Sequence, residues 1–320
     1  MTTIFVYEYC LALGLGREAS DPAHSLYREG RAMQDALAAD FAALPDTRVV
    51  TLQTATADEE KSRISYLTNS ADWTVLIAPE FDGILEQRCH WVRQSQGRLL
   101  GPNEEAVRLT ADKFALFEHW RTHGIPTPQT WLINEFPDER FPVVVKPRFG
   151  AGSTDTALIE SQRSFDRPGA IVQEFIPGRA ASVAFLVGPE QCVPLVPALQ
   201  HLAQDGTFQY LGGELPIPPD LAARALRIAA RAIACVSGLF GYVGVDLVLG
   251  SNPDGSNDHA IEINPRMTTS YVGLRALAKS NLAGAMLSVA NGDALAPLEW
   301  TDHTIQFRAD GSFEHFERTA

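Results

Sequence analysis

The stretch HAIEINPRMTTSYVGL places three polar side chains on alternate positions of a predicted strand. Side chains alternate between the two faces of a strand, so Glu262, Asn264 and Arg266 should share one face while Ile261 and Ile263 fill the other. A carboxylate, an amide and a guanidinium in a row suit a ligand site better than a hydrophobic core.

A second carboxylate lies in the preceding predicted strand, GYVGVDLVLG (241–250), where Asp246 is the only charged residue. If this strand pairs antiparallel with the strand 259–265, across a loop rich in Asn, Asp and Gly, Asp246 faces Glu262 and Asn264. Two carboxylates and an amide oxygen are the hard ligands that Mg²⁺ prefers. We interpret the set as a metal–phosphate site. The alternatives are a general acid–base pair and a structural network of carboxylate and arginine.

Lysine is scarce, with only four among the 26 Lys and Arg residues. One of them, Lys146, ends the apolar run VVVK and precedes the loop PRFGAGSTD. A lysine at the end of a buried strand has to project into a cleft or find an anion. Gly150 and Gly152 let the backbone approach a phosphate closely, and Ser153 and Thr154 add hydroxyl donors. No G-K-[ST] follows, so this is not a Walker A loop, and an ordinary turn at an edge strand is the alternative.

The segment VQEFIPG, which ends at Gly178, is a strand that runs into a turn. Its backbone groups, with the side chain of Gln173 or Glu174, could meet the edge of an adenine. A plain turn between strands is the alternative.

The predicted elements that carry these motifs fall into two regions of different type. Strands at 4–9, 48–52 and 73–80, with an amphipathic helix at 26–43, predict a parallel α/β sheet in roughly the first 100 residues. The segment LLGPN (99–103) marks a boundary. The elements that we expect beyond it are a strand entering a Gly-rich turn (141–154), strands at 170–178 and 182–188, a helix at 221–238 with a Gly stop, and the hairpin 241–265.

Composition excludes several classes of function. The 320 residues are 45% hydrophobic and 20% charged, as in ordinary globular proteins, and the formal net charge of −13 argues against a nucleic-acid partner. We find neither a basic leader nor an apolar span, so we expect no membrane partner and a cytoplasmic location. The cysteines predict reduced, buried thiols; they are Cys10, Cys89, Cys192 and Cys235.

Three further patterns have weaker interpretations. The run GLGREA (14–19) fits a dinucleotide-binding G-x-G-x-x-A loop, but the acidic residue expected after the second strand is missing. His119 and His123 are four apart on a predicted helix without the glutamate of H-E-x-x-H, which argues against zinc. A solvated face is expected for the arginines at 224, 227 and 231.

The order of the motifs resembles the ATP-grasp superfamily: Lys113 opens a helix, Lys146 precedes a Gly-rich loop, and VQEFIPG, GVDLVL and EINPR follow. The resemblance covers about residues 100–275 and implies two small sheets that hold ATP between them. The fold class that we expect is α/β, with α+β character in the ATP-grasp part. The expected units are a parallel-sheet pre-ATP-grasp domain at 1–107, a two-lobed ATP-grasp domain at 108–310 (small lobe about 113–180, large lobe about 181–310) and a tail at 311–320.

By that resemblance, the cofactors are ATP and Mg²⁺, with Mn²⁺ as a substitute. Asp246, Glu262 and Asn264 would hold the metal, and Arg266 and Lys146 would be catalytic. The residues that the resemblance assigns to ATP are Lys113, Lys146, Gly150, Ala151, Gly152, Ser153, Gln173, Glu174 and Ile176. The sequence departs from many members at Ala180, where they carry a ribose-binding Glu, so we assign no residue to the ribose.

A narrower resemblance, carried by VYEYCLALG, IAPEFDGIL, GPNEEAVRLTADK and EINPRMTTSYVGL, is to the tyramine–glutamate ligases of methanofuran biosynthesis and their relatives. It implies an ADP-forming carboxylate–amine ligase with small-molecule substrates, in which glutamate supplies the carboxylate. A homodimer is compatible with it. The segment 200–218 could line the amine pocket or be an ordinary connecting loop. Glu8 and Tyr9 could border the substrate pocket. The sequence does not identify the residue that accepts the proton of the amine. The alternatives are an ATP-grasp ligase for other amino acids, a non-catalytic nucleotide-binding protein and a Rossmann-type oxidoreductase.

Overall fold

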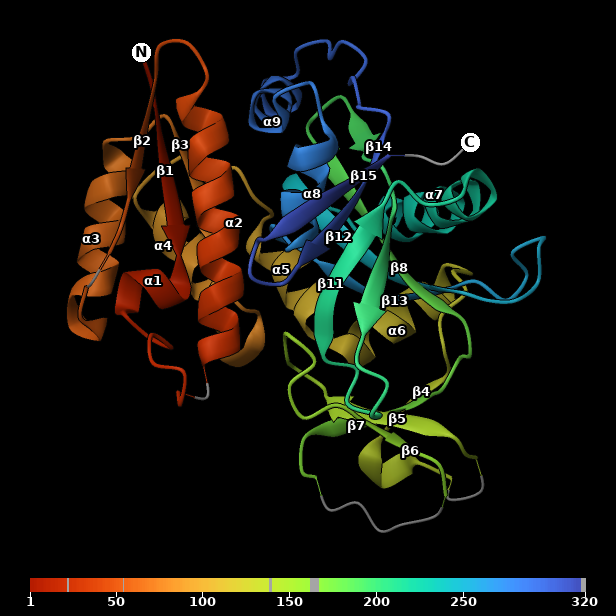
Figure 1. Cartoon of the computed structure of the whole chain (residues 1–320). Helices are drawn as coiled ribbons and strands as arrows, with labels where there is room; N and C mark the ends of the chain where they lie inside the picture. Colours follow the sequence, from red (N-terminus) through yellow and green to blue (C-terminus); the bar gives the residue numbers. More distant parts are fainter. Residues whose placement is uncertain (22, 54, 138–139, 162–166, 318–320) are drawn as a thin grey trace.

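The computed structural model of the chain is built on three β-sheets with helices packed against them (Figure 1). The first sheet belongs to the N-terminal region, the second is a small antiparallel sheet, and the third is a large sheet that runs to the C-terminal region. The structure describes residues 1–21, 23–53, 55–137, 140–161 and 167–317.

The N-terminal sheet is parallel, with strand order β2-β1-β3, as the sequence predicted. Its central strand is buried from Ile4 onward, because helices cover both faces of the sheet. The elements are β1 (Thr2–Glu8), α1 (Tyr9–Leu13), α2 (His24–Ala42), β2 (Thr47–Thr51), α3 (Ala57–Asn69), β3 (Trp73–Ile77), the 3₁₀ turn Phe81–Gly83, α4 (Ile84–Gln94) and α5 (Glu104–Ala111).

The glycine pattern at 14–19 lies in a loop rather than at the start of a helix. Gly14 ends α1 in a left-handed conformation with φ of 69°, and α2 begins only at His24. A dinucleotide fingerprint needs a glycine turn that leads directly from strand to helix, so the structural context for that alternative is missing.

The second sheet is small, with the antiparallel order β4-β7-β5-β6. A minor core of Val143, Val145, Ala170 and Val172 holds it together. Its elements are β4 (Thr130–Leu132), the 3₁₀ turn Ile133–Glu135, β5 (Val143–Pro147), β6 (Ala157–Ile159) and β7 (Ala170–Glu174).

The third sheet has the order β13-β12-β8-β10-β11-β14-β15, and β9 pairs with β8 at one side. Residues 313–317 form its last strand, although we expected 311–320 to be a tail. The elements are β8 (Arg179–Val187), β9 (Cys192–Pro194), β10 (Ala198–Leu202), β11 (Tyr210–Leu215), α7 (Pro219–Ala234), β12 (Gly241–Leu249), β13 (His259–Asn264), α8 (Ser270–Leu277), α9 (Leu282–Asn291), β14 (His303–Arg308) and β15 (Phe313–Glu317).

Helix α6 (Lys113–Thr122) packs with the large sheet, although the sequence assigned it to the small lobe. Its Trp120 is fully buried among residues of β8, β12 and α7, and the indole Nε1 donates to the carbonyl of Ala232 at 3.1 Å. The helix therefore carries Lys113 on the large-sheet side of the molecule.

Helix α7 differs from its prediction in two ways. It ends at Ala234, and Gly238 lies beyond it, where its φ of 81° and the nearby Asn103 side chain leave no room for a Cβ. The arginines of this helix are not uniformly solvated: Arg224 is buried and forms an ion pair with Asp258. The hydrophobic pattern of α7 predicted the helix correctly, but it could not reveal a carboxylate that approaches from a distant loop.

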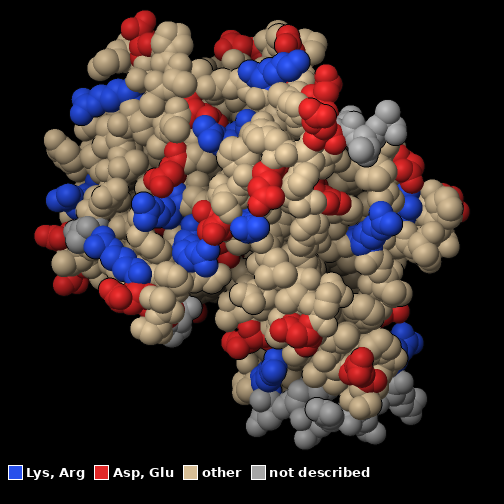
Figure 2. Space-filling model, in the orientation of Figure 1, with Lys and Arg blue, Asp and Glu red and all other residues tan. Residues whose placement is uncertain are grey.

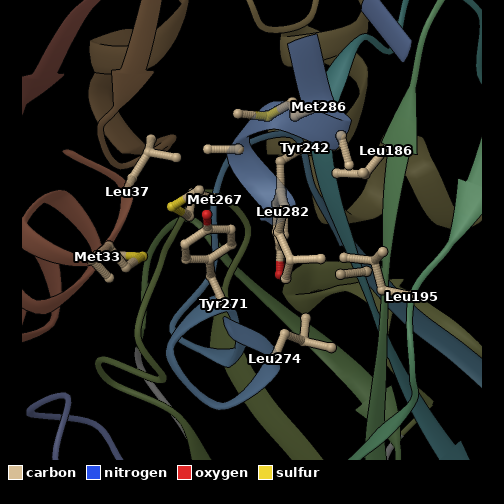
Figure 3. Close-up of a cluster of buried hydrophobic side chains, with 14 of the residues drawn as sticks. Met33, Leu37, Leu186, Leu195, Tyr242, Met267, Tyr271, Leu274, Leu282 and Met286 are labelled. Carbon is tan, nitrogen blue, oxygen red and sulfur yellow. The ribbon is translucent and has the colours of Figure 1, made fainter. Parts of the chain in front are cut away.

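The N-terminal region is joined to the large sheet by a shared core. Figure 3 shows Met33 and Leu37 of α2 facing Met267, Tyr271 and neighbouring side chains. Polar contacts cross the same boundary, since Asp40 of α2 accepts hydrogen bonds from Tyr271 and from Arg275. Burial of so much apolar surface fixes α2 against the elements that follow β13.

Three observations concern the surface charges, the helices and the cysteines. On the face shown in Figure 2, acidic and basic side chains are interspersed over the described residues. No helix within the described part of the chain is both long enough and apolar enough to cross a membrane. The four cysteines are free. Cys10 and Cys89 are buried as expected, but Cys235 is half-buried, and Cys192 is exposed because it lies on the short edge strand β9.

Candidate active site

A cavity of about 830 Å³ lies between the small sheet, the large sheet and α2. Its size is typical of small-molecule sites. The structure brings every residue of the predicted ATP, metal and catalytic sets to its wall: Lys113, Lys146, Gly150, Ala151, Gly152, Ser153, Gln173, Glu174, Ile176, Asp246, Glu262, Asn264 and Arg266.

The antiparallel hairpin of β12 and β13 forms one wall, and its register places Asp246 directly opposite Glu262. The ladder then shifts so that Leu247 pairs with Ala260, which makes Ile261 the extra residue of a β-bulge. Because a bulge interrupts strict alternation, Ile261 lines the cavity beside Glu262 instead of filling the opposite face as predicted. Ile263 is buried, as expected.

The carboxylate of Asp246 is held on both sides. Asn264 Nδ2 donates to one oxygen and Gln200 Nε2 donates to the other, each at 2.9 Å. Burial and the adjacent Glu262 carboxylate raise the pKa of Asp246 to about 7. Burial also opposes the ionisation of Glu262, but the ammonium groups of Lys113 and Lys146 outweigh it and lower the pKa of that carboxyl.

The chemistry of these donors fits a divalent cation. Two acids face each other in the cavity, and burial together with the repulsion between them raises the pKa of Asp246. A bound cation removes that repulsion, and the carboxylates together with the amide oxygen of Asn264 supply the hard ligands that Mg²⁺ takes.

Lys113 is positioned by a clamp at the start of α6. Asp112 caps the helix by accepting from the backbone of Phe114 and Ala115, and Arg148, just past β5, forms two hydrogen bonds with the same carboxylate at 2.7 and 2.6 Å. The clamp ties α6 to the end of β5. Lys113 Nζ then donates to Gly150 O at 2.7 Å and lies 3.5 Å from Glu262 Oε2.

Lys146 projects from β5 and is only 8% exposed. Burial lowers its pKa to about 8, and the repulsion from Lys113 adds to this effect. Among the described residues it takes part in no hydrogen bond and no ion pair, although the carboxylates of Glu262 and Asp246 attract it from farther away. A buried cation in this condition favours an anionic ligand.

The loop after β5 turns back over the cavity in strained conformations. Gly152 has φ of 67° and Ser153 has φ of 57°, so two successive residues adopt left-handed geometry. Gly152 also faces Leu26 of α2, the nearest contact that a Cβ there would make, at 3.5 Å. The turn keeps the backbone of 150–153 along the cavity wall.

The predicted adenine segment also lines the cavity, from the end of β7, which pairs with β5. Gln173 is buried, and its amide donates to Thr130 Oγ1 at 3.0 Å, whereas Glu174 is exposed. The ring of Phe175 packs near Phe208 with centroids 6.3 Å apart. Phe208 belongs to the hairpin loop between β10 and β11, whose tip reaches the small sheet in Figure 1.

Arg266 reaches the cavity from the segment after β13, and its guanidinium is shared with the N-terminal region. Arg266 Nε lies 2.9 Å from Glu80 Oε1, and Nη2 donates to Glu80 Oε2 at 3.1 Å. Glu80 follows β3, so this ion pair links the N-terminal sheet to the site. No sequence motif points to Glu80 as the partner of Arg266, because 186 positions separate the two residues.

Other lining residues were missed or only partly foreseen. Glu29 of α2 enters the wall, whereas Glu8 caps α1 and neither it nor Tyr9 lines the cavity. The segment 200–218 is the hairpin of β10 and β11, and it contributes Gln200, His201, Phe208, Tyr210 and Glu214 to the wall. Its richness in aromatic residues was the available signal.

His119 lies on α6, and His123 is the residue that ends the helix. His119 bonds to the carbonyl of Cys235 at 2.8 Å, and His123 bonds to the carbonyl of His119. The described residues contain no cluster of three or more His, Cys, Asp or Glu side chains arranged to hold a metal.

Comparison with family models divides the chain into two consecutive parts. A model described as the pre ATP-grasp 3 domain matches residues 32–107, and one described as the ATP-grasp domain matches residues 110–270.

Individual relatives extend over nearly the whole chain. The tyramine–L-glutamate ligase of Methanocaldococcus jannaschii is 27% identical over 310 residues, covering 91% of this chain and 90% of the relative. The crystal structure of an ATP-grasp superfamily protein from Archaeoglobus fulgidus superposes with a TM-score of 0.73 at 25% identity, over 96% of this chain and 92% of that one. The N5-carboxyaminoimidazole synthetase of Staphylococcus aureus, solved with ADP, has a TM-score of 0.67 at 14% identity over 96% and 82% of the two chains.

Proposed function

Because the chain belongs to the ATP-grasp family of ligases, we propose that it forms an amide between a carboxylate and an amine at the expense of ATP. One observation carries the proposal: a single cavity collects two lysines, a Gly-rich loop, and a pair of facing carboxylates. Cations and backbone donors suit phosphates, and paired acids suit a metal that accompanies them.

The reaction has two steps. An oxygen of the substrate carboxylate attacks the γ-phosphorus of ATP, which forms an acyl phosphate and releases ADP. The amine nitrogen then attacks the carbonyl carbon; the C–N bond forms, the C–O bond to phosphate breaks, and phosphate leaves with that electron pair. Positioning and neutralisation of charge supply most of the catalysis in phosphoryl transfer.

The chain's own residues divide this work. Lys113 and Lys146 bind the phosphates, and the backbone of 150–153 lies over them. Asp246, Glu262 and Asn264 would hold Mg²⁺, or Mn²⁺ in its place, which supplies neutralisation of the phosphate charge when it is bound. Arg266, held by Glu80, faces the transferred group as a fixed positive charge.

For the substrates, we propose glutamate as the carboxylate and tyramine or a similar aromatic amine as the nucleophile, as in methanofuran-type cofactor biosynthesis. The similarity to the M. jannaschii enzyme over nearly its whole length supports this choice. Aromatic side chains at the cavity, among them Phe175, Phe208 and Tyr210, are compatible with an aromatic amine.

The test is a mass-spectrometric screen. The protein is incubated with ATP, Mg²⁺, glutamate and a panel of amines that includes tyramine, and both ADP and new amides are measured. We expect ADP in proportion to amide, and neither when the carboxylate is omitted. ADP and amide from another amino acid would correct the substrate but keep the ligase. No ADP and no amide with any pair would leave a nucleotide-binding protein without ligase activity.

A further inference from the structure

Glu29 is a half-buried acid of the N-terminal region that enters the active-site cavity. Among the described residues up to Asp112, it alone lines the wall. It lies on α2, which the core in Figure 3 fixes against the segment after β13. Its position therefore depends on rigid packing and not on a loop.

Two hydroxyl groups orient the Glu29 carboxylate. Ser25 Oγ, one helical turn earlier, donates to Oε1 at 3.1 Å, and Thr269 Oγ1 donates to Oε2 at 3.3 Å. The charged and titratable groups that face it are Arg28 on its own helix, Arg266 after β13 and Tyr210 on β11. Burial nevertheless raises the pKa of Glu29.

The other acids at the cavity are already engaged. Asp246 and Glu262 face each other beside Lys113 and Lys146. Glu214 lies 3.6 Å from His201, and Glu174 is exposed at the end of β7. Among the acids of the described wall, only Glu29 combines interaction with the Arg266 charge and hydrogen bonds from neutral hydroxyls. Neutral partners leave its carboxylate able to take a cation or a proton.

We propose that Glu29 binds the ammonium group of the amine substrate and accepts its proton as the amine attacks the acyl phosphate. This proposal rests on the proposed ligase function. One proton passes from the ammonium to Glu29, which frees the nitrogen lone pair. After the C–N bond forms, the second proton leaves with the departing phosphate, and Glu29 returns its own proton to solvent. A general base in hydrogen-bond reach contributes about 10²- to 10⁴-fold in rate.

The test separates the two half-reactions in Glu29→Gln, which keeps the size of the side chain. Formation of the acyl phosphate is measured with hydroxylamine, which is neutral at pH 7 and traps the intermediate as a hydroxamate without an ammonium to bind. Amide formation is measured with tyramine first, and otherwise with the amine found in the screen. Asp35→Asn is the matched control, because it neutralises an exposed acid of the same helix.

We expect Glu29→Gln to form hydroxamate at the wild-type rate, while kcat/KM for the amine falls about 10²-fold. The wild type should also gain activity toward the amine as pH rises through the pKa of Glu29, and the variant should lack that rise. Asp35→Asn should behave as wild type in both assays.

The outcomes distinguish this proposal from the proposed function. Normal amide formation by Glu29→Gln overturns the role of Glu29 and keeps the ligase. Equal loss of hydroxamate and amide, with an unchanged melting curve, also overturns it, since Glu29 would then act on the carboxylate. Absence of both products in the wild type overturns the ligase itself and the proposal with it.

Discussion

The two ends of the β12–β13 hairpin both withdraw acidic residues from solvent, Asp258 fully and Asp246 with Glu262 in part, but the surroundings of these acids are opposite in kind. At the distal end, Asp258 meets Arg224 through two hydrogen bonds and also accepts from the backbone of Gly250. At the cavity end, Asp246 faces a second acid, Glu262. The nearby Lys146 has a lowered pKa, which shows that burial outweighs the acids around it.

The difference separates a structural charge from a functional one. A buried ion pair whose partners both belong to the chain needs no ligand, and breaking it destabilises the fold. A cluster that places like charges side by side in a partly dry site costs free energy of folding, and the shifted pKa values record that cost. A bound cation and phosphate would remove the cost. The four predictions below test this contrast, beginning with the largest effect.

Glu262→Gln should lower ligase activity about 10²- to 10³-fold or more, because it removes a charged oxygen from the metal set and the partner of Lys113. Steady-state ADP release at saturating ATP and Mg²⁺ measures the loss. The melting temperature should not fall, since the repulsion with Asp246 also disappears. Full activity in this variant would remove the assignment of the hairpin to the metal.

Asp258→Asn should act on stability instead. It leaves the Arg224 guanidinium buried without a countercharge, which costs about 3–5 kcal/mol in the free energy of unfolding. Urea unfolding followed by circular dichroism gives the value. Below the transition, activity per folded molecule should equal that of the wild type.

The double variant Arg224→Met with Asp258→Leu is the control for this second effect. Replacing both partners by apolar side chains should recover most of the lost stability, because no charge remains unpaired. A double variant as unstable as Asp258→Asn would contradict the ionic origin of the loss.

Lys146→Met tests the charge at the cavity end through pH. The pKa of Lys146 is about 8 in the folded chain, compared with 10.5 for the free side chain, so between these values the unfolded state binds more protons. The free energy of unfolding of the wild type, relative to that of the variant, should therefore rise as pH increases from about 8 to 10.5. Thermal unfolding without nucleotide across this range checks the sign; a flat difference would mean that the lysine is not desolvated.

Arg227→Ala should have the smallest effect, within about 0.5 kcal/mol of wild-type stability. Arg227 lies on the same helix as Arg224, but it is exposed and donates to the backbone of Asp254. Chemical denaturation measures the change, and Arg224→Ala provides the comparison with its much larger loss. Equal losses of unfolding free energy in Arg227→Ala and Arg224→Ala would show that burial does not determine how much each arginine contributes to stability.

Local sequence patterns predicted most of the elements that carry the site. Apolar alternation and turn residues located β5, β7, β12 and β13, and the antiparallel pairing of the last two then followed from their short connection. The order of the motifs also predicted which residues meet, since all the residues that the resemblance assigned to ATP, metal and catalysis line one cavity.

What escaped the sequence depends on packing between distant segments. The bulge at Ile261 changes the face of one side chain without changing the strand pattern. Glu29 and Glu80 reach the site only because α2 and β3 dock against the large sheet, and their own neighbours in sequence carry no trace of it. The pairing of Arg224 with Asp258 was missed for the same reason.

The tip of the β10–β11 hairpin has a consequence for turnover. The backbone of Leu158 on β6 donates to Gly206 O at 2.8 Å, and Phe208 lies near Phe175, so the hairpin touches the small sheet. All four residues line the cavity that we propose holds the nucleotide, so these contacts bridge two of its walls. We therefore expect the exchange of ADP for ATP to follow the rate at which the small sheet swings away from the hairpin, so that replacing Phe208 by a smaller residue speeds nucleotide release.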